Sequence, residues 1–320
     1  MIRRFWLLGL ALLLAAAAGG ALNAAELLGT VLDGRRSPQA GENVLSQFRL
    51  LEQTTASQAD VRTNGWLTVV SEEAVSMEAS RGTLAATLYP PVRAEADAPW
   101  AIVLHGGLGT DRTQVRDVAC RLSLHGYRVL TPDLYAHGAS DGTVSSLGVD
   151  DAADVLAWTQ WILARDDDAR IVLFGQDEGA TAVLLAARRE LPDAVVAAAA
   201  DSACRSAAER MDQLLEQVRP GASALDRTLL HLGYRLAHGM SVEAGGLTGS
   251  TPGDRLPLLL VHGTGDEEIP AWHSEDIAAA AGDNVRLLYV EGAGHGMARY
   301  VDETSYYEAL LGFYDEAVQR

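Results

Sequence analysis

Residues 170–180 read Arg170-Ile171-Val172-Leu173-Phe174-Gly175-Gln176-Asp177-Glu178-Gly179-Ala180. The apolar run that ends at Phe174 has the length of a buried strand, and the small residues that follow suit a closely packed helix. Between them, Gly175 to Gly179 has the G-x-S-x-G spacing of a nucleophile elbow, a sharp strand-to-helix turn that exposes its central side chain. Asp177 stands where this motif has serine, so the chemistry of the chain depends on one carboxyl group.

Short apolar runs alternate with segments of helical spacing on both sides of this turn. We expect strands at residues 84–89, 100–104, 127–130, 170–174, 194–200, 257–261 and 286–290. We expect helices at residues 112–125, 150–164, 178–190, 274–281 and 304–317. The alternation predicts an α/β fold, with a doubly wound, mostly parallel sheet. Residues 201–254 interrupt it with a helical pattern, which predicts a small helical cap.

The 320 residues divide into three parts. In residues 1–25, two arginines precede an apolar run, which predicts a signal peptide or an uncleaved membrane anchor, and we favour the anchor. The positive flank would stay in the cytoplasm, so the rest of the protein would be exported and held at the cell membrane. Residues 26–65 are polar without strong periodicity and are predicted to be a linker or N-terminal arm. Residues 66–320 form the predicted folded domain, with the cap inserted in it.

Composition narrows the class of partner. A hydrophobic content of 48% with 21% charged residues is typical of a globular protein with a sizeable core. The formal net charge of -18 argues against nucleic acid as a partner, because a polyanion would be repelled. A small-molecule substrate is expected instead. Cys120 and Cys204 leave a single disulfide open, and the sequence does not fix the oligomeric state.

Four more turn motifs each follow a predicted strand. They are His105-Gly106-Gly107, the run from Asp133 to Gly142, His262-Gly263-Thr264-Gly265-Asp266 and Gly292-Ala293-Gly294-His295-Gly296. With the elbow, they place a nucleophile, an acid and a histidine in a chain order found in one group of hydrolytic triads. Asp and His in this order do not have metal-ligand spacing, so no metal or cofactor is predicted.

The motifs assign roles to particular groups. His295 lies in a glycine-rich loop after the last predicted strand, from which its imidazole can reach the elbow. Asp266 is the expected carboxylate that orients it, with Asp201 as the competing acid. The backbone N–H groups of Gly107 and Glu178 are the expected oxyanion hole. The other histidines are predicted to hold turns or to lie on helices: His105, His125, His137, His231, His238, His262 and His273.

Residues 66–318 resemble the α/β-hydrolase superfamily, and more narrowly the bacterial membrane-anchored hydrolases related to serine peptidases and lysophospholipases. The resemblance rests on the motifs above, on the N-terminal apolar segment, and on the helix start Gly148-Val149-Asp150 with Asp154. It implies a hydrolase with Asp177, Asp266 and His295 in the positions of nucleophile, acid and histidine.

The chain departs from this pattern at Asp177 and at Glu178, where an apolar residue is common. A carboxylate that attacks an ester carbonyl gives a mixed anhydride, which reverts easily. Attack on a saturated carbon gives a stable alkyl ester that histidine-activated water can hydrolyse, as in the haloalkane dehalogenases and epoxide hydrolases that this elbow resembles.

The accessory residues of those two groups are missing from the sequence. Glu178 is expected to repel a halide beside the elbow. Epoxide hydrolases use cap tyrosines to protonate the epoxide oxygen, and this cap has only Tyr234. A third interpretation makes Asp177 a general base for water, with a pKa raised by Glu178 and burial. The alternative to a hydrolase is a catalytically degenerate protein with a binding or scaffolding role. The presence of both Asp266 and His295 favours the hydrolase.

Overall fold

The computed structural model describes residues 19–35, 50–93, 97–189, 191–248 and 256–319. An eight-stranded sheet with strand order β1-β2-β4-β3-β5-β6-β7-β8 forms its centre. The pairs β1·β2 and β2·β4 are antiparallel, and all other neighbouring strands are parallel. The strands are β1 (Glu73–Ala79), β2 (Gly82–Tyr89), β3 (Trp100–Leu104), β4 (Arg128–Pro132), β5 (Ile171–Gln176), β6 (Val195–Asp201), β7 (Leu258–Gly263) and β8 (Val285–Val290).

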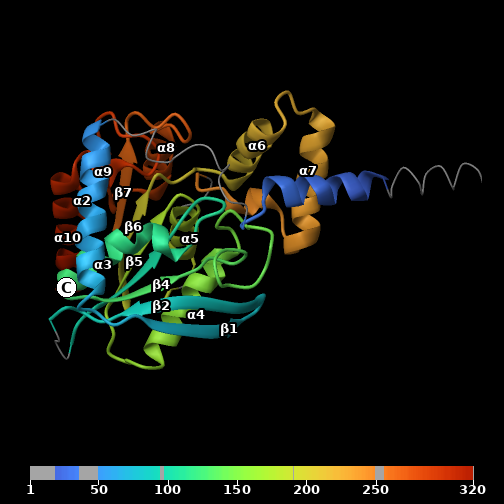
Figure 1. Ribbon diagram of the computed structural model, residues 1–320. Helices are drawn as coiled ribbons and strands as arrows, with labels where there is room; N and C mark the ends of the chain where they lie inside the picture. The colour runs from blue at the N-terminus through green and yellow to red at the C-terminus, as the bar shows by residue number, and fades with distance from the viewer. Residues whose placement is uncertain (1–18, 36–49, 94–96, 190, 249–255, 320) are drawn as a thin grey trace, which may run out of the picture.

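Helices cover both faces of this sheet (Figure 1). On one face, a core of buried side chains joins the sheet to α2 (Leu50–Leu67), α3 (Arg116–Leu124), α9 (Ala298–Val301) and α10 (Glu303–Val318). On the other face, a second core joins it to α4 (Asp151–Leu163), α5 (Glu178–Ala187) and α8 (Trp272–Ala281). Every residue of β3, β5 and β7 is buried, because helices cover these central strands on both sides. This is the α/β-hydrolase fold that the sequence predicted.

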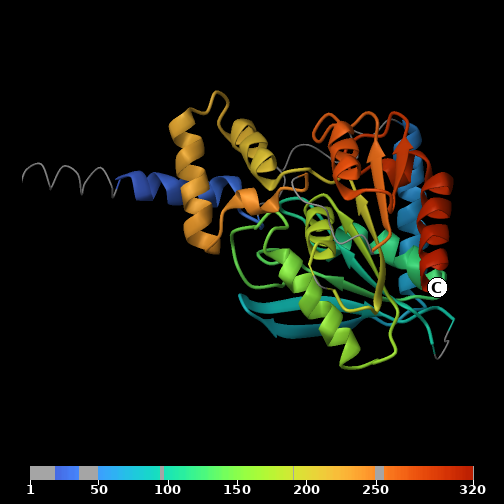
Figure 2. The same cartoon turned by 180° about the vertical axis from the view of Figure 1, so that it is seen from behind.

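The cap lies between β6 and β7, beyond one end of the sheet (Figure 2). It contains α6 (Ala207–Val218), α7 (Ala224–His238) and the short helix η3 (Val242–Gly245). Ser206 and Ser223 cap α6 and α7, each accepting a hydrogen bond from a backbone N–H of the first turn. The predicted cap boundaries enclose these helices, although residues 249–254 lie outside the described residues.

The N-terminal part contains more ordered structure than the sequence indicated. Residues 19–31 are helical, and Leu27, Leu28, Val31 and Leu32 belong to the core that also holds α4 and α5. Most of α2 falls in the predicted linker, and it contacts α3. Residues 36–49 lie outside the described part of the chain.

Most of the predicted anchor, residues 1–18, also lies outside the described residues. Within the part of the chain that the structure describes, no helix combines the length and apolar character needed to cross a membrane. Cys120 and Cys204 are both buried and free, so the disulfide that the sequence left open is absent from the structure.

Candidate active site

The elbow joins β5 to α5 through a strained backbone at Asp177. Its φ of 47° and ψ of -108° lie in a region that non-glycine residues seldom adopt. The two flanking glycines allow this sharp turn. A Cβ on Gly175 would lie 2.2 Å from the carbonyl oxygen of Gly179, and one on Gly179 would lie 2.4 Å from the carbonyl oxygen of His105. The turn therefore presents the Asp177 side chain at the carboxyl end of β5.

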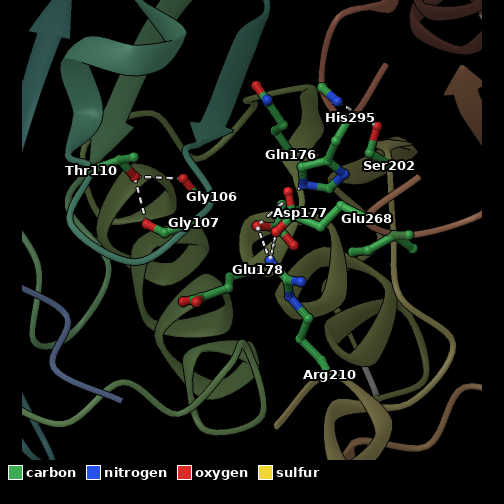
Figure 3. Close-up of polar contacts among 12 residues, drawn as sticks. Gly106, Gly107, Thr110, Gln176, Asp177, Glu178, Ser202, Arg210, Glu268 and His295 are labelled. Atoms are coloured by element: carbon green, nitrogen blue, oxygen red, sulfur yellow. Dashed lines mark hydrogen bonds and ion pairs between the residues drawn. The ribbon is translucent and has the colours of Figure 1, made fainter. Parts of the chain in front are cut away.

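The structure brings the three predicted triad residues together. His295 Nδ1 lies 2.8 Å from Asp266 Oδ2, and His295 Nε2 lies 3.5 Å from Asp177 Oδ2. The other oxygen of Asp266 accepts hydrogen bonds from the backbone N–H groups of Glu268 and Ile269. These bonds fix the carboxylate, so the imidazole is held between the two aspartates. Figure 3 shows His295 beside Asp177.

Asp201, the competing acid, is engaged elsewhere. It is buried at the end of β6, where it accepts hydrogen bonds from Tyr306 and Ser202, each at 2.9 Å. Of the two candidate acids, Asp266 is therefore the one that contacts His295.

The predicted oxyanion turn faces the elbow. Gly107 has a φ of 83°, and a Cβ placed on it would lie 3.6 Å from Asp177 Oδ2. The Thr110 hydroxyl, which contacts the carbonyl oxygens of Gly106 and Gly107, fixes this turn (Figure 3). Glu178 is the first residue of α5, and backbone N–H groups in the first turn of a helix have no intrahelical acceptor. The two predicted backbone donors therefore lie on the two segments that adjoin the Asp177 carboxylate.

A fourth charged side chain, Arg210, reaches the site from the cap. Its Nη2 lies 3.8 Å from Asp177 Oδ2 and 2.5 Å from Glu268 Oε1, and its side chain is 7% exposed. Sequence reasoning missed it. The available signal was its spacing, because Arg210 falls on the buried face of α6 with Ala207, Met211 and Leu214.

These charges favour an ion pair between the Asp177 carboxylate and the His295 imidazolium. Burial alone would raise the pKa of Asp177, but Arg210 and His295 outweigh it and lower that pKa. Burial would likewise lower the pKa of His295, but its contacts with Asp177 and Asp266 raise it instead. The prediction that Asp177 has a raised pKa is therefore wrong, because the sequence could not show that Arg210 lies beside it.

It is Glu178, the next residue, whose pKa is raised. Burial raises the pKa of Glu178 to about 7, with the Asp177 charge as a smaller cause in the same direction. The Glu178 side chain points away from His295 (Figure 3), accepts a hydrogen bond from Ser145 at 2.8 Å and lies 3.7 Å from His137. The Glu178 carboxyl group is therefore directed toward Ser145 and His137.

Three turn histidines hold loops, as predicted. His105 is fully buried, and its Nε2 accepts a hydrogen bond from the backbone N–H of Leu134, which ties the oxyanion turn to the loop after β4. His137 contacts the Tyr135 carbonyl oxygen, and His262 contacts Ser274 and the carbonyl oxygen of Ile269. Each ring is enclosed by the loop that it supports.

Comparison with known proteins supports the α/β-hydrolase fold. Residues 99–244 match the family model described as the alpha/beta hydrolase fold. The uncharacterized protein Rv2307c of Mycobacterium tuberculosis is 29% identical over 244 residues, which cover 76% of this chain and 79% of that protein. The family match supports the α/β-hydrolase fold that the strand order shows.

Two solved structures show the same fold at low sequence identity. The Pyrococcus furiosus esterase Pf2001 superposes with a TM-score of 0.60 at 18% identity, covering 78% of this chain and 92% of the esterase. A bacterial membrane phospholipase A superposes with a TM-score of 0.55 at 19% identity, covering 99% of this chain and all of the phospholipase.

Proposed function

We propose that the protein is a hydrolase that uses Asp177 as a nucleophile on saturated carbon and acts on a small-molecule substrate. The observation that carries this proposal is the charge state of the elbow. Arg210 and His295 keep the Asp177 carboxylate ionised despite its burial, and an ionised carboxylate is a nucleophile but a weak general base.

In the first step, an oxygen of Asp177 attacks the electrophilic carbon of the substrate. A new carbon–oxygen bond forms, and the bond to the leaving atom breaks, with its electron pair going to that atom. The product is an ester between Asp177 and the substrate carbon. The proton that His295 carries at rest passes to the leaving atom or to water.

In the second step, water hydrolyses this ester. Esterification removes the charge of Asp177, which is a main cause of the raised pKa of His295, so the imidazole can now act as a base. Its Nε2 takes a proton from water, and the hydroxide attacks the carboxyl carbon of Asp177. The oxyanion that forms is positioned for the backbone N–H groups of Gly107 and Glu178.

Collapse of this intermediate breaks the bond between the carboxyl carbon and the alkyl oxygen. The new carboxyl group gives its proton to the departing alkoxide, which leaves as an alcohol. Asp177 returns to a carboxylate and His295 to an imidazolium, so the cycle closes. Asp266, held by Ile269 and Glu268, keeps the imidazole oriented throughout.

The general-base interpretation has less support than the nucleophile, because the lowered pKa of Asp177 makes it a poor proton acceptor. The degenerate interpretation also has less support. A protein that only binds a partner has no chemical need for a strained elbow, an oriented imidazole and an ionised carboxylate in contact.

The test is to trap the ester. We expect His295→Gln, incubated with a set of epoxides and haloalkanes, to accumulate a covalent adduct on Asp177 that mass spectrometry locates. The wild-type protein should turn the same compound over and show little adduct. Asp177→Asn should show neither adduct nor turnover.

Two results separate the alternatives. Turnover by wild type without any adduct in His295→Gln would favour Asp177 as a general base. No adduct and no turnover with any compound, in protein whose fold is verified by circular dichroism, would favour the degenerate protein. Asp177→Ser is a further control, since ester hydrolysis by that variant would show that the rest of the site is intact.

A further inference from the structure

The Arg210 guanidinium keeps two of its three nitrogens unused. Nε and Nη1 are buried and have no hydrogen-bond partner among the described residues, while Nη2 lies beside Asp177 and Glu268. Buried donors are almost always satisfied, so an arginine that lacks partners at two nitrogens calls for an explanation. Its place at the elbow indicates that a substrate atom supplies the missing acceptor.

The proposed attack of Asp177 on the substrate carbon creates such an acceptor. Before reaction, the negative charge lies on the Asp177 carboxylate, 3.8 Å from Arg210 Nη2. After reaction, Asp177 is a neutral ester and the charge lies on the leaving atom. A guanidinium next to the nucleophile therefore loses one anionic partner as another forms, and the total charge of the site does not change.

Among the described residues, the cap has no tyrosine hydroxyl that is free to donate to a substrate. Tyr234, its only tyrosine, is fully buried and donates its hydroxyl hydrogen to the carbonyl oxygen of Ser146 at 2.9 Å. It is therefore committed to holding the loop before α4. Arg210 is the cap side chain that contacts the nucleophile.

We propose that Arg210 stabilises the leaving atom of the substrate, and that this atom is an oxygen, as in an epoxide. The inference rests on the proposed nucleophilic role of Asp177. The planar fork of a guanidinium matches the lone pairs of an oxygen, and such charge-assisted hydrogen bonds are stronger than neutral ones. Arg210 would thus take the place of the tyrosines that the cap lacks.

Proton transfer also favours oxygen. When Asp177 opens the ring of an epoxide, the carbon–oxygen bond breaks and an alkoxide forms beside Arg210. The imidazolium of His295 gives this alkoxide its proton and becomes the neutral base that the second step requires. Water then supplies the proton that restores the imidazolium, so one epoxide and one water give one diol. A halide leaves without a proton, and His295 would have to lose its own to solvent.

The experiment measures the rate at which the Asp177 adduct forms in a single turnover. Full-length wild type, Arg210→Met and Arg210→Lys are mixed with styrene oxide or with 1-bromohexane, quenched and analysed by mass spectrometry. We expect Arg210→Met to slow adduct formation from the epoxide by about 10²–10³-fold, the usual effect of removing one donor to a developing oxyanion. Arg210→Met also removes a charge that keeps Asp177 ionised, so both adducts should form more slowly. The loss should be clearly larger for the epoxide, because bromide is a far better leaving group.

Two further variants separate this role from support of the fold. Arg210→Lys keeps the positive charge beside Asp177 but lacks the forked donors, so we expect it to fold normally and still to slow the epoxide reaction. Arg205→Met is the matched control, because Arg205 lies at the base of the same cap, where it pairs with Glu209 and Asp276. It should react like wild type.

Each outcome bears on a different claim. Equal slowing of both compounds, or no slowing of the epoxide, would overturn the role of Arg210 while leaving Asp177 as the nucleophile. An adduct from the bromide but none from the epoxide in wild type would overturn the choice of an oxygen leaving atom. The absence of any adduct in both wild type and His295→Gln would overturn the nucleophile and, with it, this inference.

Discussion

Asp177 combines two conditions that oppose folding. Its backbone adopts a positive φ, a conformation that costs on the order of 1–3 kcal/mol for a non-glycine residue, and its carboxylate is charged while buried. The charge persists because Arg210 and His295 lie against it, so the three side chains stabilise one another as a group. Removal of one partner would leave the others buried without compensation.

Glu178 gives a test at a single residue. Its pKa rises from 4.5 to about 7 on folding, so the folded protein binds more protons than the unfolded chain between these values. Stability should therefore fall as pH rises through this range, by up to about 1.4 kcal/mol per pH unit. We expect Glu178→Gln to remove this dependence and to unfold at a higher temperature than wild type above pH 7.

Thermal unfolding measured at several pH values checks this prediction. Glutamine keeps an acceptor for the Ser145 hydroxyl and provides a donor near His137 Nε2, which has no hydrogen-bond partner in the described structure. Identical pH profiles for the variant and wild type would show that folding does not raise the pKa of Glu178.

The N-terminal helical segment, residues 19–31, and the turn that follows it support the site from a distance. A Cβ on Gly233 of α7 would lie 3.1 Å from the carbonyl oxygen of Ala24, so the segment and the cap are in close contact. Beyond this helix, the backbone of Leu32 accepts a hydrogen bond from Ser145, and that of Gly34 accepts one from Gly109, which follows the predicted oxyanion turn. The segment thus connects the cap to two loops around the elbow.

A substitution at Leu32 tests how much this segment contributes to the free energy of unfolding. Its side chain is fully buried, so we expect Leu32→Ala to destabilise the protein by about 2–5 kcal/mol. Leu22→Ala is the matched control, because Leu22 is 73% exposed and its loss should change stability by no more than about 0.5 kcal/mol. Chemical denaturation of the two variants gives both values. Equal stabilities would mean that residues 24–35 contribute little to the folded domain.

In the whole molecule, the parallel sheet gathers the site at one edge. β3, β5 and β7 run in the same direction, so the loops after their carboxyl ends bring Gly107, Asp177 and Asp266 together. The cap adds Arg210 from beyond this edge. On the outer side of α7, leucines at helical spacing are exposed, and Leu22 of the N-terminal segment is exposed as well. The exposed leucines of α7 are Leu225, Leu232 and Leu236.

We propose that residues 1–25 anchor the protein to the cell membrane, with the hydrolase domain outside the cytoplasm. The arginine pair before an apolar run and the exposed leucines support this proposal. In bacterial cells, full-length protein should sediment with membranes and be digested by protease added to spheroplasts. Deletion of residues 2–18, which keeps the buried residues from Ala24 onward, should move it to the soluble cytoplasmic fraction. Full-length protein that resists the protease would contradict this orientation.

The regular part of the fold was predictable because its signals are local. The predicted strand at residues 100–104 coincides with β3, and the elbow and its triad partners were identified from turns that follow strands. The exposed edge strand β1 and helix α2 were missed. Five of the seven residues of β1 are charged, small or polar, and none of the seven is buried. Helix α2 has almost no amphipathic pattern, so neither element has a clear periodic signal.

The sequence by itself determined the α/β-hydrolase fold, the elbow, and Asp177, Asp266 and His295 as the candidate site residues. These features depend on apolar periodicity and turn glycines, which are visible in short stretches of sequence. Only the tertiary structure decided the charge of the site. Arg210 is 33 residues from Asp177 in the sequence, and Glu178 turns away into contact with Ser145. A pKa depends on burial and on charges within a few ångströms, which only the folded chain brings together. For that reason the aspartate of the elbow is ionised in the folded protein, a property that the sequence left open.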